Sequence, residues 1–151
     1  MNSDLENKLA KDFSFMRWQR VGADGEDASV TNTYVAFGCE VGDGWYVLLH
    51  DLCEQIQETY KRYGAEVDIV IDQVKEKYGG LRFYYHREGR LTDEIADEMV
   101  SQRLEDIVQQ YEDRSEHICE DCGKEGRLRE DLSWILTLCD NCYEKMHRGR
   151  S

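Results

Sequence analysis

The sequence contains no proline, although average usage of about 5% would give roughly seven or eight in a chain of this length. Every turn must therefore be built from glycine, asparagine, aspartate and serine. The chain also has no apolar stretch near the roughly 18 residues that a transmembrane helix needs, which excludes a membrane protein of that kind. Its first ten residues are polar and acidic, unlike a secretory signal, so we expect a cytoplasmic protein.

Positive charge is scarce. The 151 residues include 19 Lys and Arg against 32 Asp and Glu, a formal net charge of −13. A protein with this net field does not adhere to nucleic-acid phosphates without specific contacts. We therefore expect a protein partner with a basic surface, and consider direct nucleic-acid binding the weaker alternative. The sequence does not indicate an oligomeric state.

Recognisable catalytic motifs are also missing. The sequence has no phosphate-binding glycine motif, zincin helix or nucleophile elbow, so we predict that the protein is not an enzyme. The Gly42-Asp43-Gly44 segment lacks the lysine and glycine spacing of a phosphate loop and is better interpreted as a helix-entry turn. His50 and Cys53 lie three apart on a predicted helix, where a buried free cysteine is favoured over a catalytic dyad.

What is present predicts an α+β fold. The expected sheet is small and antiparallel, is built on a central hairpin, and is packed by about three helices. The expected elements are a helix from Ser3 to about Trp18, an acidic loop over 22–27, a strand over 31–37, a helix over 45–63, strands over 67–75 and 81–86 around the Gly79-Gly80 turn, and a long helix over 92–116.

The C-terminal segment carries the most specific motif. Its cysteines follow the spacing C-x2-C-x16-C-x2-C, which is typical of a four-cysteine zinc site. The four predicted ligands are Cys119, Cys122, Cys139 and Cys142. Four thiolates close the coordination shell, so we predict structural Zn²⁺ that contributes on the order of 10 kcal/mol to local folding. Rubredoxin-type iron, a redox dithiol pair, and replacement of one thiolate by His117 or His147 remain alternatives.

The order of elements around these cysteines narrows the class of module. A short hairpin over 127–138 lies between the pairs, and a helix follows Cys139, as in a treble-clef finger; a two-hairpin zinc ribbon is the near alternative. We predict an acidic α+β domain over 1–118 and a zinc-binding module over 119–151 docked on it. A segment of this size cannot hold itself together without the metal.

Negative charge is concentrated outside that module. Residues 119–151 hold seven acidic and six basic residues, whereas the 91–116 helix has nine acidic residues against Arg103 and Arg114. Such a face can imitate phosphates and bind a basic partner, although a merely solvated helix face is the alternative. The residues predicted to contact a partner, on this helix and at the hairpin tip, are Asp93, Glu94, Asp97, Glu98, Glu105, Asp106, Glu76 and Arg82.

Two other functions compete with protein binding. The arginines of the tail, together with Trp134, suggest a nucleic-acid-associated zinc-finger regulator. The aromatic residues of the hairpin, with Glu76 and Arg82, suggest base stacking or a small enzyme with a site near 76–86. The tail arginines are Arg127, Arg129, Arg148 and Arg150, and the hairpin aromatics are Tyr78, Phe83, Tyr84 and Tyr85.

Three segments in order resemble a family of small bacterial, phage and prophage proteins of unassigned function. They are Gly42–Tyr46 running into Asp51–Cys53, the block EKYGGLRFYY over 76–85, and the segment from Ser115 to Gly123 together with Trp134 and Thr137–Cys139. The resemblance covers about residues 42–142 and implies a mobile-element setting. In that setting we expect a non-enzymatic inhibitor or modulator of a bacterial defence or nucleic-acid-handling protein.

Overall fold

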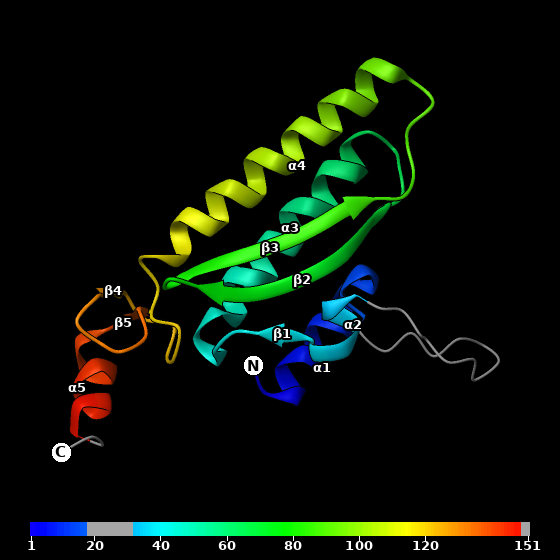
Figure 1. The fold of residues 1–151 in the computed structure, drawn as a ribbon. Coiled ribbons are helices and arrows are strands. Elements are labelled where there is room, and N and C mark those ends of the chain that lie inside the picture. The colour runs from blue at the N-terminus through cyan, green and yellow to red at the C-terminus, as the bar shows by residue number, and fades with distance from the viewer. Residues whose placement is uncertain (18–31, 149–151) are drawn as a thin grey trace.

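The computed structural model describes residues 1–17 and 32–148, and its side chains are described up to residue 146. The predicted acidic loop over 22–27, Trp18, Arg150 and the side chains of His147 and Arg148 lie outside this part. The elements in chain order (Figure 1) are α1 (Ser3–Asp12), η1 (Ser14–Met16), α2 (Thr33–Phe37), β1 (Cys39–Glu40), η2 (Asp43–Trp45), α3 (Tyr46–Arg62), β2 (Ile69–Lys77), β3 (Gly80–Arg87), α4 (Glu94–Ser115), β4 (Arg127–Arg129), β5 (Leu136–Leu138) and α5 (Asp140–Arg148). The α+β class is confirmed.

The main sheet has three strands in the order β1-β2-β3. The predicted β2–β3 hairpin is confirmed as antiparallel, but β1 pairs with β2 in parallel, so the sheet is mixed. The hairpin turn lies one residue earlier than predicted, because Lys77 pairs with Gly80 and the two-residue loop is Tyr78-Gly79. Both loop residues have positive φ angles, 53° and 81°, as a type I′ turn requires.

The strand predicted over 31–37 is wrong: Thr33–Phe37 forms the short helix α2. The side chain of Asn32 accepts a hydrogen bond from the backbone N–H of Val35 and caps the helix. Gly38, with a φ of 63°, ends the helix by donating its N–H to the carbonyl of Tyr34. Two strong caps in a short segment therefore outweigh the β preference of its branched and aromatic residues.

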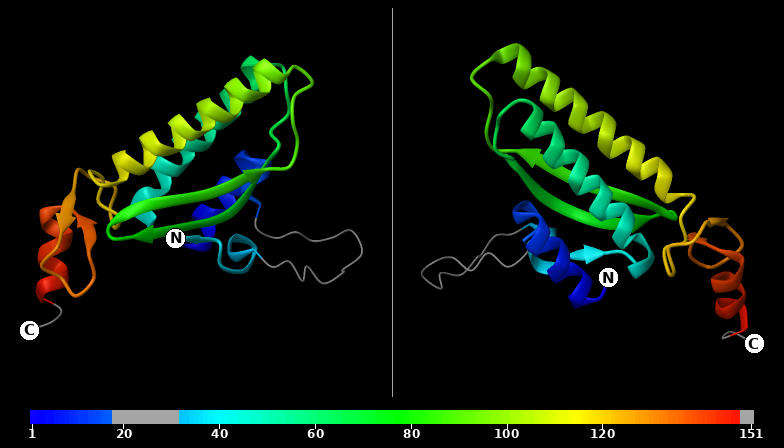
Figure 2. Two further views of the ribbon diagram at one scale, coloured as in Figure 1. Left: turned by 45° about the horizontal axis from the view of Figure 1, so that its top comes forward. Right: turned by 180° about the vertical axis from the view of Figure 1, so that it is seen from behind.

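Helices α3 and α4 lie side by side along one face of the hairpin (Figures 1 and 2). The edge strand β3 is tied to α4, since the N–H of Leu81 donates to Ser115 Oγ and the N–H of Phe83 to a Glu112 carboxylate oxygen. The largest fully buried side chains between these layers and α1 are Trp45, Tyr60, Leu9, Met16, Leu49, Leu52, Ile56, Leu81, Leu104, Ile107, Val74 and Val100.

A polar network joins the other end of α4 to the sheet. Arg87 on β3 donates two hydrogen bonds to the Asp68 carboxylate, one each to the carboxylate and the backbone carbonyl of Asp97, and one to Ser101 Oγ, at 2.7–3.2 Å. Tyr60 of α3 donates its hydroxyl to Asp68 at 2.5 Å. Burial opposes the charge on Asp68, but these donors outweigh it and leave its pKa below the usual value. The network therefore fixes β3, α3 and α4 relative to one another.

Candidate metal centre

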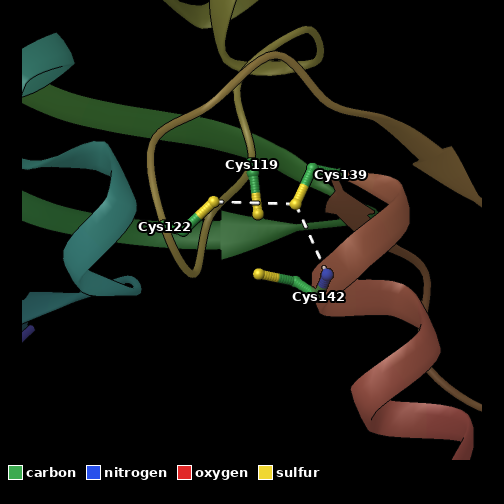
Figure 3. A group of neighbouring side chains, drawn as sticks. All are labelled: Cys119, Cys122, Cys139 and Cys142. Carbon is green, nitrogen blue, oxygen red and sulfur yellow. Dashed lines mark hydrogen bonds between the residues drawn. The ribbon is translucent and has the colours of Figure 1, made fainter.

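The four predicted ligands converge on one point. The Sγ atoms of Cys119, Cys122, Cys139 and Cys142 lie within 4.8 Å of one another, and those of Cys122 and Cys139 are 3.6 Å apart (Figure 3). A tetrahedral zinc site with Zn–S bonds of about 2.3 Å has sulfur atoms about 3.8 Å apart. A disulfide would need about 2.05 Å, and the six cysteines are free thiols. The spacing fits a four-thiolate zinc centre.

The first pair of cysteines lies in a tight knuckle. The backbone N–H of Cys119 donates to the carbonyl of Lys124 at 2.7 Å, and that of Gly123 donates to Cys119 at 2.9 Å. Gly123 has a φ of 82°, where a residue with a side chain would be strained. These bonds turn the chain so that the sulfurs of Cys119 and Cys122 face the same point.

The second pair lies at the beginning of α5. Cys139 immediately precedes this helix and Cys142 lies in its first turn. The N–H of Cys142 donates to the Cys139 sulfur at 3.4 Å. The positive end of the helix dipole also favours thiolates at this position. With β4 and β5 paired between the two ligand pairs, the order knuckle, hairpin, helix follows the treble-clef alternative.

Hydrogen bonding and burial shift the thiol pKa values of the second pair in opposite directions. The hydrogen bond from the Cys142 backbone lowers the pKa of Cys139 to about 7, whereas burial raises the pKa of Cys142. Four adjacent thiolates repel one another, and a divalent cation removes this repulsion. Four sulfur ligands leave no open coordination position, so the centre is a structural Zn²⁺ site.

Close backbone contacts join this centre to the rest of the molecule. The N–H of Gly44 donates to the carbonyl of Glu120 at 2.8 Å, and that of Gly42 donates to the Glu120 carboxylate at 2.9 Å. A Cβ atom on either glycine would lie 2.3 Å from a backbone oxygen of Cys119 or Glu120. The sequence prediction treated this glycine segment only as a helix-entry turn and missed that the metal knuckle packs directly on it.

Two more hydrogen bonds lie next to this contact. The indole N–H of Trp45 donates to the carbonyl of Ile118 at 2.8 Å. Thr137 Oγ1, which is fully buried, donates to the carbonyl of Gly79 at 2.6 Å at the hairpin tip. The hairpin tip and the η2 segment thus both contact the residues around the metal centre, while the division of the chain after residue 118 stays a prediction.

The predicted partner-binding residues fall into two groups. Five have exposed side chains: Asp93, which caps α4 by accepting the N–H groups of Ile95 and Ala96, and Glu94, Glu98, Glu105 and Asp106 on the helix itself, of which Asp106 accepts a hydrogen bond from Gln102 one turn away. The other three have internal contacts: Asp97 binds Arg87, Glu76 accepts hydrogen bonds from the N–H of Gly79 and the indole of Trp134, and the half-buried Arg82 donates to the carbonyl of Leu81.

The residues of the possible His50–Cys53 dyad are differently exposed. Cys53 is fully buried, and burial raises its thiol pKa well above the usual value, which confirms the interpretation as a core cysteine. His50 instead contacts Asp12 at 3.1 Å and Glu54 at 3.5 Å. The half-buried His50 lies close to the exposed carboxylates of Asp51 and Glu54 on α3.

The nucleic-acid candidates are divided between the interior and the surface. Among the hairpin aromatics, Phe83 is buried and Tyr85 half-buried, while Tyr78 and Tyr84 are exposed. In the tail, Arg129 is buried and binds the carbonyl of Leu138 and the carboxylate of Asp140. Arg127 is exposed and lies 3.7 Å from Asp140. His117 is exposed and is not part of the cysteine cluster.

No family model, curated protein or solved structure matches this chain. Of the motifs that carry the family resemblance, the four-cysteine segment is the one that the structure supports as a zinc site. None of the helices in the described residues combines the length and apolar character needed to cross a membrane.

Proposed function

We propose that the protein is a non-enzymatic, zinc-stabilised binding protein whose α4 surface engages a protein partner with a basic surface. The supporting observation is the alignment of exposed carboxylates on α4. With 3.6 residues per turn, Glu94, Glu98 and Glu105 fall within about 40° of one another around the helix axis. Asp106 and Asp113, seven residues apart, form a second exposed line beside them.

The same surface carries exposed apolar side chains. Ile95 and Met99 lie one helical turn apart, and 73% and 54% of their surfaces are exposed. Their positions around the helix adjoin those of the exposed carboxylates, on the side away from the core. A merely solvated acidic face does not require such residues. Apolar side chains surrounded by charges are typical of protein interfaces, where the apolar groups supply affinity and the charges supply orientation and association rate.

The structure holds this surface rigidly. Val100, Leu104 and Ile107 bury the opposite side of α4 in the core, and the Arg87 network fixes its first turns. A helix of 22 residues spans about 33 Å, enough to present its charges along a groove or a nucleic-acid-binding surface of a partner. Little conformational entropy is lost on binding when the surface is already ordered.

The resemblance to proteins of phages and prophages supports a more specific version. In that version the partner is a bacterial defence or nucleic-acid-handling protein, and the α4 carboxylates occupy the basic surface that normally contacts phosphates. The protein then inhibits or modulates its partner by steric and electrostatic competition and acts in the cytoplasm. The alternative of a zinc-finger regulator that uses the tail arginines is weakened by the internal contacts of Arg129.

Affinity capture with paired charge variants tests the proposal. The wild-type chain, the α4 variant E94K/E98K/E105K and the α3 variant D51K/E54K/E58K are immobilised and exposed to a bacterial lysate. The substituted residues are all exposed, and the two variants change net charge equally. We expect a protein with a basic surface to be retained by the wild type and the α3 variant, lost with the α4 variant, and eluted by salt.

Purified partner then separates the contributions of charge and apolar contact. We expect I95S/M99S to weaken binding mainly through faster dissociation, and E94K/E98K/E105K mainly through slower association. The matched apolar control is F37S/V47S, because Phe37 and Val47 are comparably exposed elsewhere. Equal capture by wild type and both charge variants, or binding that is insensitive to salt, contradicts the proposal.

A further inference from the structure

A groove of about 480 Å³ lies where the hairpin tip meets the segment before β5. Its walls are formed by Lys75, Glu76, Lys77 and Tyr78 from the hairpin and by Ser133, Trp134 and Ile135 from the zinc-binding segment. The two aromatic side chains are unusually open to solvent, with 68% of Tyr78 and 63% of Trp134 exposed. This groove is not part of the α4 surface.

The backbone of Tyr78 is in a conformation that the residue disfavours. Its φ of 53° is the described residues' sole positive φ outside glycine. Type I′ turns prefer asparagine, aspartate or glycine at this position, because a bulky side chain there is strained. The exposed Tyr78 ring does not pack in the core, so hydrophobic burial does not offset this strain. A strained, exposed aromatic residue beside a groove indicates a role in binding.

Trp134 is held in place on the other side. Its indole N–H donates to Glu76 Oε2 at 2.8 Å, while Glu76 Oε1 accepts the N–H of Gly79 at 2.7 Å. One carboxylate therefore fixes the tryptophan and the turn that carries Tyr78. Both oxygens of Glu76 have donors, which leaves the aromatic faces and the lysines to recognise a ligand.

Two ammonium groups border the groove in a protein that is otherwise strongly acidic. Lys77 Nζ lies 5.7 Å from the centre of the Tyr78 ring. Lys75 stands opposite Arg82 in the sheet register, an arrangement of like charges that lowers stability, although Glu40 lies beside Lys75 on β1. A local excess of positive charge next to exposed rings is complementary to a ligand that has both planar bases and anionic groups.

We propose that this groove binds single-stranded nucleic acid, with an unpaired base against the Tyr78 and Trp134 rings and adjacent phosphates near Lys75 and Lys77. Aromatic platforms flanked by cations bind single strands with little sequence preference, because every base has a π-face. A duplex hides these faces within its stack, so a single strand is the expected form. The acidic field of the whole protein makes binding weak and local, and the inference does not depend on the function proposed for α4.

Fluorescence anisotropy with the full zinc-loaded chain tests this assignment. The probes are fluorescein-labelled octamers of deoxythymidine and of uridine, which distinguish DNA from RNA, and a labelled duplex of equal length. We expect the wild type to bind at least one single-stranded octamer more tightly than the duplex. W134A and Y78A should each weaken binding about tenfold, the loss of one stacked base. K75Q/K77Q should lower the slope of log affinity against log salt by about 1.4.

A further variant separates binding from folding. Because asparagine suits the first position of a type I′ turn, Y78N should raise the melting temperature by about 2 °C while still weakening octamer binding about tenfold. F37A and K61Q/R62Q, which alter an exposed ring and exposed charges elsewhere, should leave affinity unchanged. No single-strand binding, equal binding by Y78N and wild type, or displacement of the octamer by an acidic peptide of equal charge would overturn the proposal.

Discussion

Two regions of the molecule are stabilised in different ways: residues before Cys119, and the zinc-binding segment that follows. The first buries a continuous cluster from α1 to α4, including Trp45, Tyr60 and Leu49, each removed from water. In the second, the buried cluster consists of Leu138 and three of the four cysteines. Hydrophobic burial can stabilise the first without help, whereas the second needs the metal. The predictions below test that contrast, from the largest expected effect to the smallest.

Removing the zinc should unfold one region and spare the other. We expect C139S, or exposure to a strong chelator, to abolish hydrogen-exchange protection over 119–148, since a site of this kind contributes on the order of 10 kcal/mol. Protection in α3, and in β2 and β3 away from the hairpin tip, should persist, because their buried core contains none of the metal ligands. Exchange measured by mass spectrometry, together with elemental analysis showing one zinc per wild-type chain, checks both statements.

The matched control substitutes a cysteine outside the centre. C53A leaves a small cavity in the α3 core and should lower the free energy of global unfolding by about 1–2 kcal/mol without loss of zinc. Complete unfolding of C139S, or a C53A protein that loses its metal, would show that the two regions are not separately stabilised.

Within the first region, we expect the next largest loss of stability when the polar network around Arg87 is broken. R87M should destabilise the protein by about 2–4 kcal/mol, because it leaves the partly buried Asp68 carboxylate without its cation. Both side chains are partly open to water, which moderates this loss. Urea unfolding followed by circular dichroism measures this change. The double variant R87M/D68N removes the unpaired charge and should recover part of the loss; an equal or larger loss contradicts this account.

The same network makes the stability of the fold depend on pH in the acid range. The folded-state pKa values of Asp68 and Asp97 are lowered, the first by its Arg87 and Tyr60 donors against the effect of burial, the second chiefly by the backbone N–H of Leu91. Their stabilisation is therefore fully present above about pH 4, the ordinary carboxyl range, and is lost as pH falls through the lower folded-state values. We expect wild-type stability to fall below pH 4 more steeply than that of R87M/D68N.

The contrast also explains what could be predicted from sequence. The zinc ligands follow from cysteine spacing, and the hairpin and long helices follow from periodicity, because these signals are local. The strand predicted over 31–37 is wrong because the helix caps Asn32 and Gly38, both visible in the sequence, outweigh the β propensity of the residues between them. The Asn32-to-Gly38 spacing is the signal that could have corrected it.

Other features had no local signal. The two-residue strand β1 pairs with residues about 35 positions away, and its parallel pairing depends on the tertiary fold. Glu76 and Asp97 were predicted as partner contacts from their charge alone, but tertiary neighbours Trp134 and Arg87 engage them. Nothing in the spacing of Gly42 and Gly44 shows that the chain at Glu120 packs against them.

The junction between the two regions offers a smaller test. T137V keeps the shape of a fully buried residue but removes the 2.6 Å hydrogen bond to the Gly79 carbonyl. An unsatisfied buried acceptor costs about 1–3 kcal/mol. We expect protection to fall both in β5 and at the hairpin tip while zinc is retained. Loss confined to β5 would mean that the two regions are not coupled through this bond. The matched control is T92S, an exposed threonine ahead of α4.

The smallest effect should come from the exposed hydrogen bond between Trp134 and Glu76, which also joins the two regions. W134F keeps an aromatic ring in the groove but removes the indole N–H that Glu76 accepts at 2.8 Å. Because water can replace an exposed donor, we expect a loss of about 0.5–1 kcal/mol, below that of T137V. Glu76 still accepts the Gly79 N–H, so the turn should stay formed. Thermal unfolding of both variants ranks the two bonds; if W134F costs as much as T137V, the groove wall rather than the buried threonine holds the regions together.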